Sequence, residues 1–143
     1  MKKLNVYLSG SVKNSDETFQ DWRERCGRLQ EHDTSLSLNF INPINYFNYT
    51  DKNPQTDKQC LDQFMWLIDK SDILLVNLDN SQNSVGAGIE VEHAFCKGVP
   101  IIAFGQNKDT WYNWIELRAS VILRDLFEAI SYIDSYYAKS ILD

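Results

Sequence analysis

The stretch "SDILLVNLDNSQNSVGAGIEVEHAFCKGVPIIAF", residues 71–104, decides the fold of this chain. It contains two continuous apolar runs of strand length, at residues 72–78 and 99–104. Such runs are typical of strands buried on both faces, as in a parallel sheet that is covered by helices on each side. The apolar positions between the runs have a helical spacing, and Gly98 is suited to end that helix. The stretch therefore predicts a strand, a crossover helix and a second strand.

The same alternation of strands and helices extends to both sides of this stretch. Further strands are expected at residues 4–10 and 36–42, helices at residues 16–32 and 58–71, and a long polar loop at residues 43–57. A helical turn at residues 114–119 precedes residues 120–137, which begin with a candidate fifth strand and continue as an amphipathic helix. Four or five strands alternating with helices predict one doubly wound α/β domain, residues 1–143, with a mostly parallel, flavodoxin- or Rossmann-like sheet.

The charge balance argues against a polynucleotide ligand. The 14 basic and 20 acidic residues give a formal net charge of -6, and Lys and Arg form no cluster. A small anion held by a few local donors is compatible with this composition. No run approaches the ~20 apolar residues that span a bilayer, and the apolar part of the N-terminal segment is too short for a signal peptide. We therefore expect a cytoplasmic protein with no membrane partner.

The cysteines and histidines suggest no metal site. Cys26, Cys60 and Cys96 are odd in number and contain no CxxC pair, which favours reduced thiols. His32 and His93 have no metal-ligand spacing with a cysteine. We expect no metal and no cofactor.

Three loops are predicted to meet where the parallel strands end. They are residues 9–14 ("SGSVKN"), 43–57 and 79–88, and ligands of doubly wound sheets bind at this edge. The first loop offers the hydroxyl of Ser11 and the ammonium of Lys13 near a helix start, which attracts anions. A polar turn without a ligand is the alternative interpretation of this loop.

Glu90 follows a glycine-rich turn that contains Gly86 and Gly88. Glycine lets the backbone approach a ligand closely, so this turn could cradle a phosphate or a sugar. An ionised carboxylate beside it could attack an anomeric carbon and form a glycosyl-enzyme. The alternative is that Glu90 lies in the first turn of the helix and only complements the helix dipole. The neighbouring Glu92 is assigned to solvent or to a subunit contact.

These motifs resemble the nucleoside 2-deoxyribosyltransferase superfamily, which includes 2'-deoxynucleoside 5'-monophosphate N-glycosidases. The resemblance covers "VYLSGSV", "LIDKSDILLVNL" and "SVGAGIEVEHAFCKGVPIIAF", and more loosely "NPINYFNY" and "LRDLFEAISYI". Its most specific part is the pattern small-Gly-x-Gly-x-Glu between a buried strand and "KGVPII". It implies an enzyme that cleaves or transfers N-glycosidic bonds of a small nucleoside or nucleotide.

The resemblance also implies roles for individual residues. Glu90 matches the nucleophile that attacks C1' of the (deoxy)ribose, and Tyr7 matches the tyrosine that orients this carboxylate. Asn113 matches a residue that members supply to the neighbouring subunit, which implies a homodimer or a higher oligomer. The full set of predicted substrate-binding residues is Gly10, Ser11, Lys13, Ser84, Gly86, Gly88 and Asn113, of which Ser11, Lys13 and Ser84 match a 5'-phosphate site.

The sequence departs from the family pattern at several positions. Phe64 stands where many members carry an acid that assists the leaving base, and Asp62 lies two residues earlier. Ala87 replaces the usual Thr, and Glu92 replaces a small residue. These departures leave open a nucleotide-sensing module that does not turn over its ligand. A flavodoxin-like interaction domain, in which Glu90 only caps a helix, is a further alternative.

Overall fold

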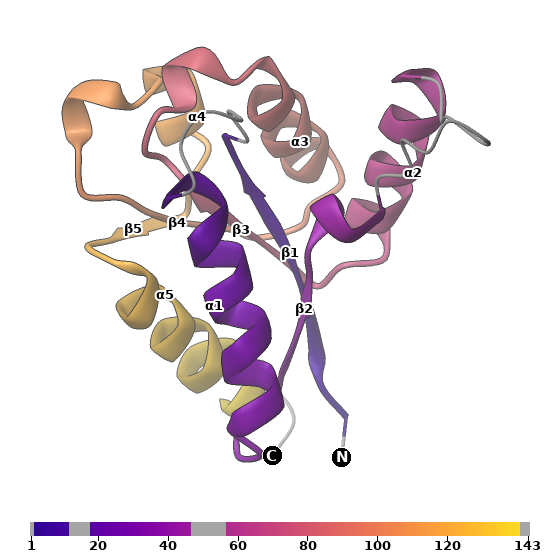
Figure 1. Cartoon of the computed structure of the whole chain (residues 1–143), viewed down its shortest axis with the longest axis vertical. Coiled ribbons are helices and arrows are strands. Elements are labelled where there is room, and N and C mark those ends of the chain that lie inside the picture. Colours follow the sequence, from indigo (N-terminus) through magenta and orange to yellow (C-terminus); the bar gives the residue numbers. More distant parts are fainter. Residues whose placement is uncertain (1, 12–17, 47–56, 141–143) are drawn as a thin grey trace.

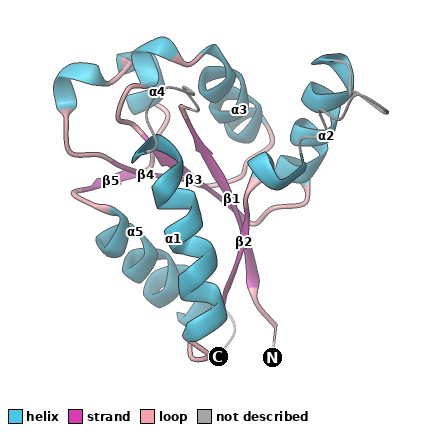
Figure 2. Cartoon of the chain, in the orientation of Figure 1, coloured by secondary structure: helices cyan, strands magenta, loops and turns pink. Residues whose placement is uncertain are grey.

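The computed structural model describes residues 2–11, 18–46 and 57–140, and these form a five-stranded sheet in the order β2-β1-β3-β4-β5 (Figure 2). All neighbouring strands are parallel. The strands are β1 (Leu4–Gly10), β2 (Leu38–Ile41), β3 (Ile73–Asn77), β4 (Ile101–Phe104) and β5 (Val121–Leu123). The predicted doubly wound α/β fold is confirmed, and the uncertain fifth strand is present.

Helices cover both faces of the sheet (Figure 1). One face carries α1 (Thr18–His32) and α5 (Leu126–Tyr132), which continues as a π-helix over Ile133–Lys139. The other face carries α2 (Asp57–Asp69), α3 (Val85–Cys96) and the short α4 (Asn113–Glu116). The crossover between β3 and β4 is α3, as the opening stretch of sequence predicts.

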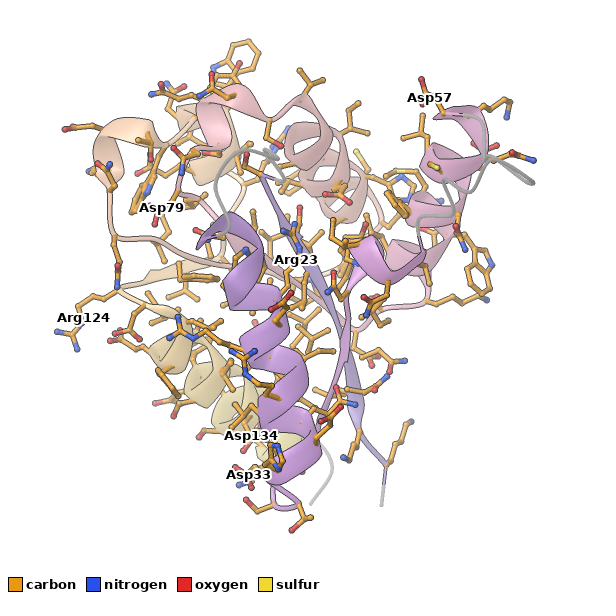
Figure 3. All side chains as sticks on the ribbon, viewed as in Figure 1. Arg23, Asp33, Asp57, Asp79, Arg124 and Asp134 are labelled. Atoms are coloured by element: carbon orange, nitrogen blue, oxygen red, sulfur yellow. The ribbon has the colours of Figure 1, made fainter. Side chains whose placement is uncertain are left out.

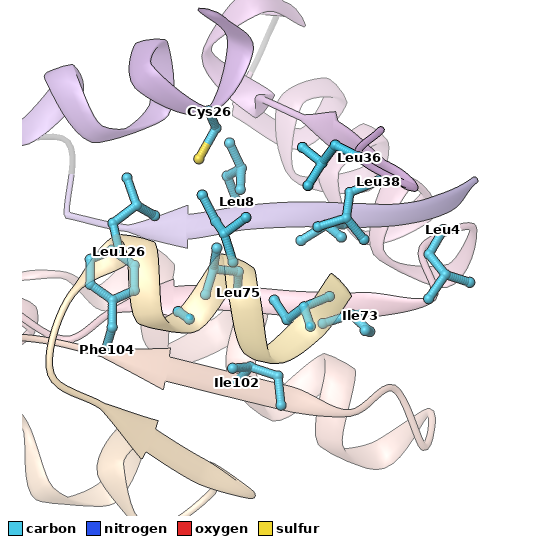
Figure 4. Packing of buried hydrophobic residues seen from close by; sticks show 14 of the residues in the cluster. Leu4, Leu8, Cys26, Leu36, Leu38, Ile73, Leu75, Ile102, Phe104 and Leu126 are labelled. Carbon is cyan, nitrogen blue, oxygen red and sulfur yellow. The ribbon is translucent and has the colours of Figure 1, made fainter. Parts of the chain in front are cut away.

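The continuous apolar runs are explained by two separate cores. Ile73 and Leu75 of β3 pack against α1 and α5, in the cluster shown in Figure 4. Leu74 and Val76, the intervening residues, pack against α2 and α3. Successive side chains of a strand point to opposite faces. When both faces are covered by helices, every side chain of the strand is buried, so the apolar run is continuous.

The crossover helix is capped at both ends by its own sequence. At its start, the Ser84 side chain accepts a hydrogen bond of 3.1 Å from the backbone N–H of Ala87. At its end, Gly98 has a φ of 75°, a left-handed conformation that favours glycine. The backbone N–H of Val99 then donates back to the carbonyl of Ala94 at 2.9 Å. Gly98 ends the helix as predicted.

The loop after β4 is held by Asp79, which follows β3 and is labelled in Figure 3. Its Oδ1 accepts hydrogen bonds from the backbone N–H of Asn107 at 2.9 Å and from Nε1 of Trp111 at 3.0 Å. The indole of Trp111 lies against Gly105, where a Cβ would come within 2.7 Å of the ring. Gly105 is therefore required by the packing of Trp111 and not by backbone conformation.

Two sequence expectations are modified by the structure. The segment 43–57 begins with a 3-10 helix at Pro43–Tyr46, so it is not a loop throughout, and residues 47–56 lie outside the described residues. The helix expected at residues 16–32 is described from Thr18, and its proposed caps at residues 15 and 16 also lie outside them.

The three cysteines form no disulfide. Cys26 and Cys60 are buried, and Cys96 is exposed on the outer side of α3. Burial raises the pKa of the Cys26 thiol to about 12. In the part of the chain that the structure describes, no helix is long and apolar enough to cross a membrane, and no group of His, Cys, Asp and Glu could hold a metal ion.

Candidate active site

A cavity of about 450 Å³ lies at the carboxyl ends of β1, β2 and β3. Its described lining comes from the end of β1 and the segments that follow the three strands, together with one side chain of α1, residues of α2 and the first half of α3. The lining residues are Gly10, Ser11, Arg23, Pro43, Ile44, Leu61, Phe64, Met65, Asn83, Ser84, Val85, Gly86, Ala87, Ile89 and Glu90. The expected convergence of the three loops is confirmed for their described residues.

The carboxylate of Glu90 is held by two hydroxyl groups of β1. Tyr7 donates its phenolic O–H to Oε2, and Ser9 donates its hydroxyl to Oε1 at 2.7 Å. Tyr7 and Ser9 are two residues apart on a strand, so both side chains point to the face that α3 covers. Glu90 is only 9% exposed, yet it lines the cavity. The structure thus fixes one carboxylate, with both oxygens hydrogen-bonded, at the wall of an open cavity.

Burial is the main influence on the protonation of Glu90 and Tyr7. It raises the pKa of Glu90, although the hydrogen bonds from Tyr7 and Ser9 and the charge of Arg23 act in the opposite direction. Burial, together with the charge and hydrogen bond of Glu90, also raises the pKa of Tyr7. Tyr7 therefore keeps its proton and acts as a hydrogen-bond donor to the carboxylate.

Arg23, on α1, places a buried guanidinium in the same cavity (Figure 3). It is 2% exposed, and its Nη2 donates to the carbonyl of Gly10 at 3.0 Å. Its Nε and Nη1 have no hydrogen-bond partner. The guanidinium also lies 4.8 Å from the ring centre of Trp22, a distance typical of a cation–π contact. Burial lowers the pKa of Arg23, but arginine stays charged at any ordinary pH.

The start of α3 differs from the sequence expectation. Glu90 lies in the second turn of the helix, because the helix begins at Val85 and its first turn contains no acid. Ser84 caps the helix, so the interpretation of Glu90 as a helix cap is wrong. The carboxylate of Glu90 points to β1 instead, where Tyr7 and Ser9 bind it.

Comparisons with known proteins place this architecture among solved structures. No protein-family model matches the sequence, and no curated protein matches it. A 2-deoxyribosyltransferase from Bacillus psychrosaccharolyticus aligns with a TM-score of 0.73 and 12% identity over 94% of each chain. A CMP N-glycosidase from Clostridium botulinum aligns with a TM-score of 0.59 and 18% identity, over 91% of this chain and 98% of its own. This chain shares its fold with both enzymes.

A further solved structure shares this fold. A conserved protein from Enterococcus faecalis V583 has a TM-score of 0.71 and 16% identity, covering 94% of this chain and 99% of its own. All three alignments span nearly the whole chain at low identity. The resemblance drawn from the sequence is thus confirmed at the level of the fold.

Within this fold, the predicted residues are distributed as follows. Glu90 and Tyr7 are hydrogen-bonded to each other, and the predicted substrate-binding residues Gly10, Ser11, Ser84 and Gly86 line the cavity beside them. Gly88 and Asn113 do not line this cavity, and Asn113 is exposed at the start of α4. Lys13 lies outside the described residues.

Two residues of the site were missed by the sequence reasoning, Ser9 and Arg23. Each carries a signal in the sequence. Ser9 follows Tyr7 by two residues on a predicted strand, so it had to share the face of the tyrosine. Arg23 lies four residues after Phe19 and three before Cys26, within the apolar stripe of its helix. A charged residue in such a stripe is buried only if it has a partner or a ligand.

The remaining wall of the cavity is apolar. It is lined by Leu61, Phe64 and Met65 of α2 and by Val85 and Ile89 of α3. Phe64, which the sequence comparison places at the position of a family acid, is part of this apolar wall. As a result, Glu90 is the only carboxylate among the described lining residues.

Proposed function

We propose that this chain cleaves the N-glycosidic bond of a (deoxy)nucleoside or of its 5'-monophosphate, with Glu90 as the nucleophile. The observation that carries the proposal is the buried carboxylate, held by Tyr7 and Ser9, at the wall of a cavity of about 450 Å³. This volume lies within the ordinary range of small-molecule sites. The deoxyribosyltransferase and CMP N-glycosidase neighbours support the reaction class at the level of the fold.

The reaction proceeds by displacement at C1' of the sugar. An oxygen of the Glu90 carboxylate forms a bond to C1' while the C1'–N bond breaks, and the electron pair of that bond leaves with the base. The glycosyl ester is then resolved by water, which makes the protein a hydrolase, or by a second base, which makes it a transferase. Tyr7 and Ser9 hold the carboxylate so that its reactive oxygen is presented in one orientation.

Protonation of the leaving base depends on whether the cavity contains a second acid. Glycosidases of the common type use a second carboxyl group as the acid. Here the described lining offers none besides Glu90, since Phe64 stands on α2 where such an acid is common. With no second carboxyl group among the described lining residues, we expect bases that leave readily as anions to be the best substrates.

The test is the release of free base from deoxynucleosides, ribonucleosides and their 5'-monophosphates, followed by chromatography with and without a second base. We expect release by the wild type and none by Glu90→Ala. Glu128→Ala, which removes a carboxylate on α5 across the sheet, serves as the matched control and retains activity. Full turnover by Glu90→Ala would refute the assignment of the nucleophile.

A catalytically silent nucleotide-binding module is the second candidate, and Phe64 is the observation that favours it. Removal of the leaving-group acid lowers turnover without closing the cavity. Tight binding of a nucleotide, measured by calorimetry, with no base released over long incubation would decide for the binding module. Release of base at any enzyme-dependent rate would decide against it.

We also propose that two copies of the chain associate through α3 and α4. Val85 and Phe95 of α3, Trp114 of α4 and Leu117, the residue after α4, are large apolar side chains that are exposed in the single chain. Asn113, which does not line the cavity of its own chain, would then contribute to the cavity of the partner. Sedimentation velocity tests this, because Leu117→Lys should give a monomer, whereas Phe127→Lys, an exposed position on α5, should leave the assembly unchanged.

A further inference from the structure

We propose that Arg23 is the specificity residue of this cavity and that its free Nε and Nη1, with the hydroxyl of Ser11, bind the phosphate of a nucleoside 5'-monophosphate. Arg23 does not belong to the set of residues that the superfamily resemblance assigns to substrate. The inference rests on the proposed function and narrows its substrate class from nucleosides in general to the monophosphates.

Three buried donors of the cavity lack a partner. They are Nε and Nη1 of Arg23 and the hydroxyl Oγ of Ser11. Arg23 is 2% exposed and Ser11 is 4% exposed, so bulk solvent does not satisfy these groups. A buried donor without an acceptor costs free energy, and a charged donor costs more than a neutral one. Both residues line the same cavity, which indicates that a ligand supplies the missing acceptor.

No described residue of the cavity supplies the missing acceptor, and an anionic group of the ligand fits the three donors. Glu90 is the only carboxylate of the described lining, and its two oxygens accept from Tyr7 and Ser9. No hydrogen bond joins Glu90 to Arg23, whose Nη2 is used by the carbonyl of Gly10. Two adjacent N–H groups of a guanidinium match two oxygens of a phosphate, and such charge-assisted hydrogen bonds are stronger than those between neutral groups.

The start of a helix in the lining also favours an anion. The twelve-residue helix α3 begins at the cavity, which is lined by its N-cap Ser84 and by Gly86 of its first turn. The start of a helix carries partial positive charge. A phosphate between this helix start and Arg23 would leave Glu90 beside the sugar, as displacement at C1' requires.

The first measurement is calorimetric binding of probes that carry no base and cannot be cleaved. We use ribose 5-phosphate and 2-deoxyribose 5-phosphate, the two free sugars, and inorganic phosphate. The wild type is expected to bind the sugar phosphates at least ~10-fold more tightly than the free sugars, because a charge-assisted hydrogen bond corresponds to about one to two powers of ten in affinity. No detectable preference for the phosphorylated sugars would overturn the proposal.

The variants separate the guanidinium from other cations. Arg23→Gln removes the charge and is expected to weaken binding of the sugar phosphates by about 10- to 100-fold, with binding of a free nucleoside changed less than ~3-fold. Arg23→Lys keeps the charge but loses the paired donors, so it should lie between Arg23→Gln and the wild type. Arg25→Gln, two residues along on the exposed side of α1, is the control and should bind like the wild type.

Two outcomes would refute the role of Arg23. One is an equal loss of affinity for sugars and sugar phosphates in Arg23→Gln, and the other is no loss at all. If Arg23→Gln does not fold, Ser11→Ala gives the decision, since it removes one of the three donors and should weaken only the phosphorylated probes. The probes contain no base, so their binding does not depend on catalysis. If Arg23→Gln selectively loses the sugar phosphates while the wild type releases no base from any nucleoside or nucleotide, this inference stands and the proposed function fails.

The experiments also identify the opposite case, in which the proposed function holds and the phosphate role of Arg23 fails. If the wild type releases base and Arg23→Gln loses cleavage of nucleosides and monophosphates to the same degree, the proposed function stands and the phosphate role of Arg23 falls. A rise in KM for monophosphates in Arg23→Gln that is at least ~10-fold larger than the rise in KM for nucleosides would support both.

Discussion

Ser9→Ala removes one of the two hydrogen bonds that hold Glu90 and tests the role of β1 in the site. In the wild type, Oγ of Ser9 donates to Oε1 of Glu90 at 2.7 Å in a buried setting. A hydrogen bond to a charged group contributes about 1.5–3 kcal/mol, and one to a neutral group about 0.5–1.5 kcal/mol. The loss of unfolding free energy in Ser9→Ala should therefore be larger when Glu90 is ionised than when it is protonated.

The direction of the pH dependence follows from the raised pKa of Glu90. The bond from Ser9 favours the carboxylate, so its removal raises the pKa of Glu90 further and moves the acidic limb of the activity profile to higher pH. The stability gap between the wild type and Ser9→Ala should widen as pH rises through the pKa of Glu90. Above that pKa, the variant should melt about 5–10 °C lower, at about 3 °C per kcal/mol for a chain of this size.

The assay is thermal unfolding of the wild type and Ser9→Ala across the pH range, together with the pH profile of kcat. The matched control is Ser71→Ala, which removes a buried hydroxyl that donates to the carbonyl of Leu67 at 2.7 Å, a neutral acceptor. Its stability gap should not depend on pH. If Ser9→Ala behaves like Ser71→Ala and leaves the acidic limb in place, the reasoning about Glu90 is refuted.

Further predictions concern the same carboxylate and one packing contact. Glu90→Gln should abolish base release, yet its melting temperature relative to the wild type should rise as pH increases from the ordinary pKa of a glutamate to the raised pKa of Glu90, and level off above it. The sign follows because a raised folded-state pKa means that ionisation of Glu90 costs stability, whereas Gln does not ionise; a constant difference would contradict it. Tyr7→Phe should fold, lower kcat by about 10- to 100-fold, and shift the acidic limb upward, because the remaining carboxylate is less well stabilised; an unchanged kcat would show that the phenol is dispensable. Gly105→Ala should cost about 1–3 kcal/mol by chemical denaturation, because the new methyl group would displace the Trp111 indole from Asp79; wild-type stability with unchanged tryptophan fluorescence would refute this packing argument.

Much of the fold follows from sequence because its signals are local. The apolar runs determine the positions of β3 and β4 directly, and Gly98 determines where α3 ends. Each signal lies within the element that it determines or next to it. Parallel topology then brings the loops after β1, β2 and β3 to one edge without further information. The order of the strands and the split of the core into two clusters required the coordinates.

The site was only partly predictable, because its contacts join residues far apart in the chain. Tyr7 and Glu90 were paired through family resemblance, and the structure joins them across 83 positions. Local pattern placed Glu90 in the first turn of its helix, which is wrong because Ser84 sets the helix start. Arg23 was overlooked because it reads as one of several charges on an amphipathic helix, and only packing shows that it faces inward.

The distribution of thiols in this fold has a practical consequence. Cys26 and Cys60 are buried, whereas Cys96 is exposed on α3, the helix whose outer side is proposed to meet a second copy. A maleimide fluorophore should therefore label the native protein at a single position. That dye would report on subunit exchange in real time, through energy transfer between donor- and acceptor-labelled chains, without any engineered cysteine.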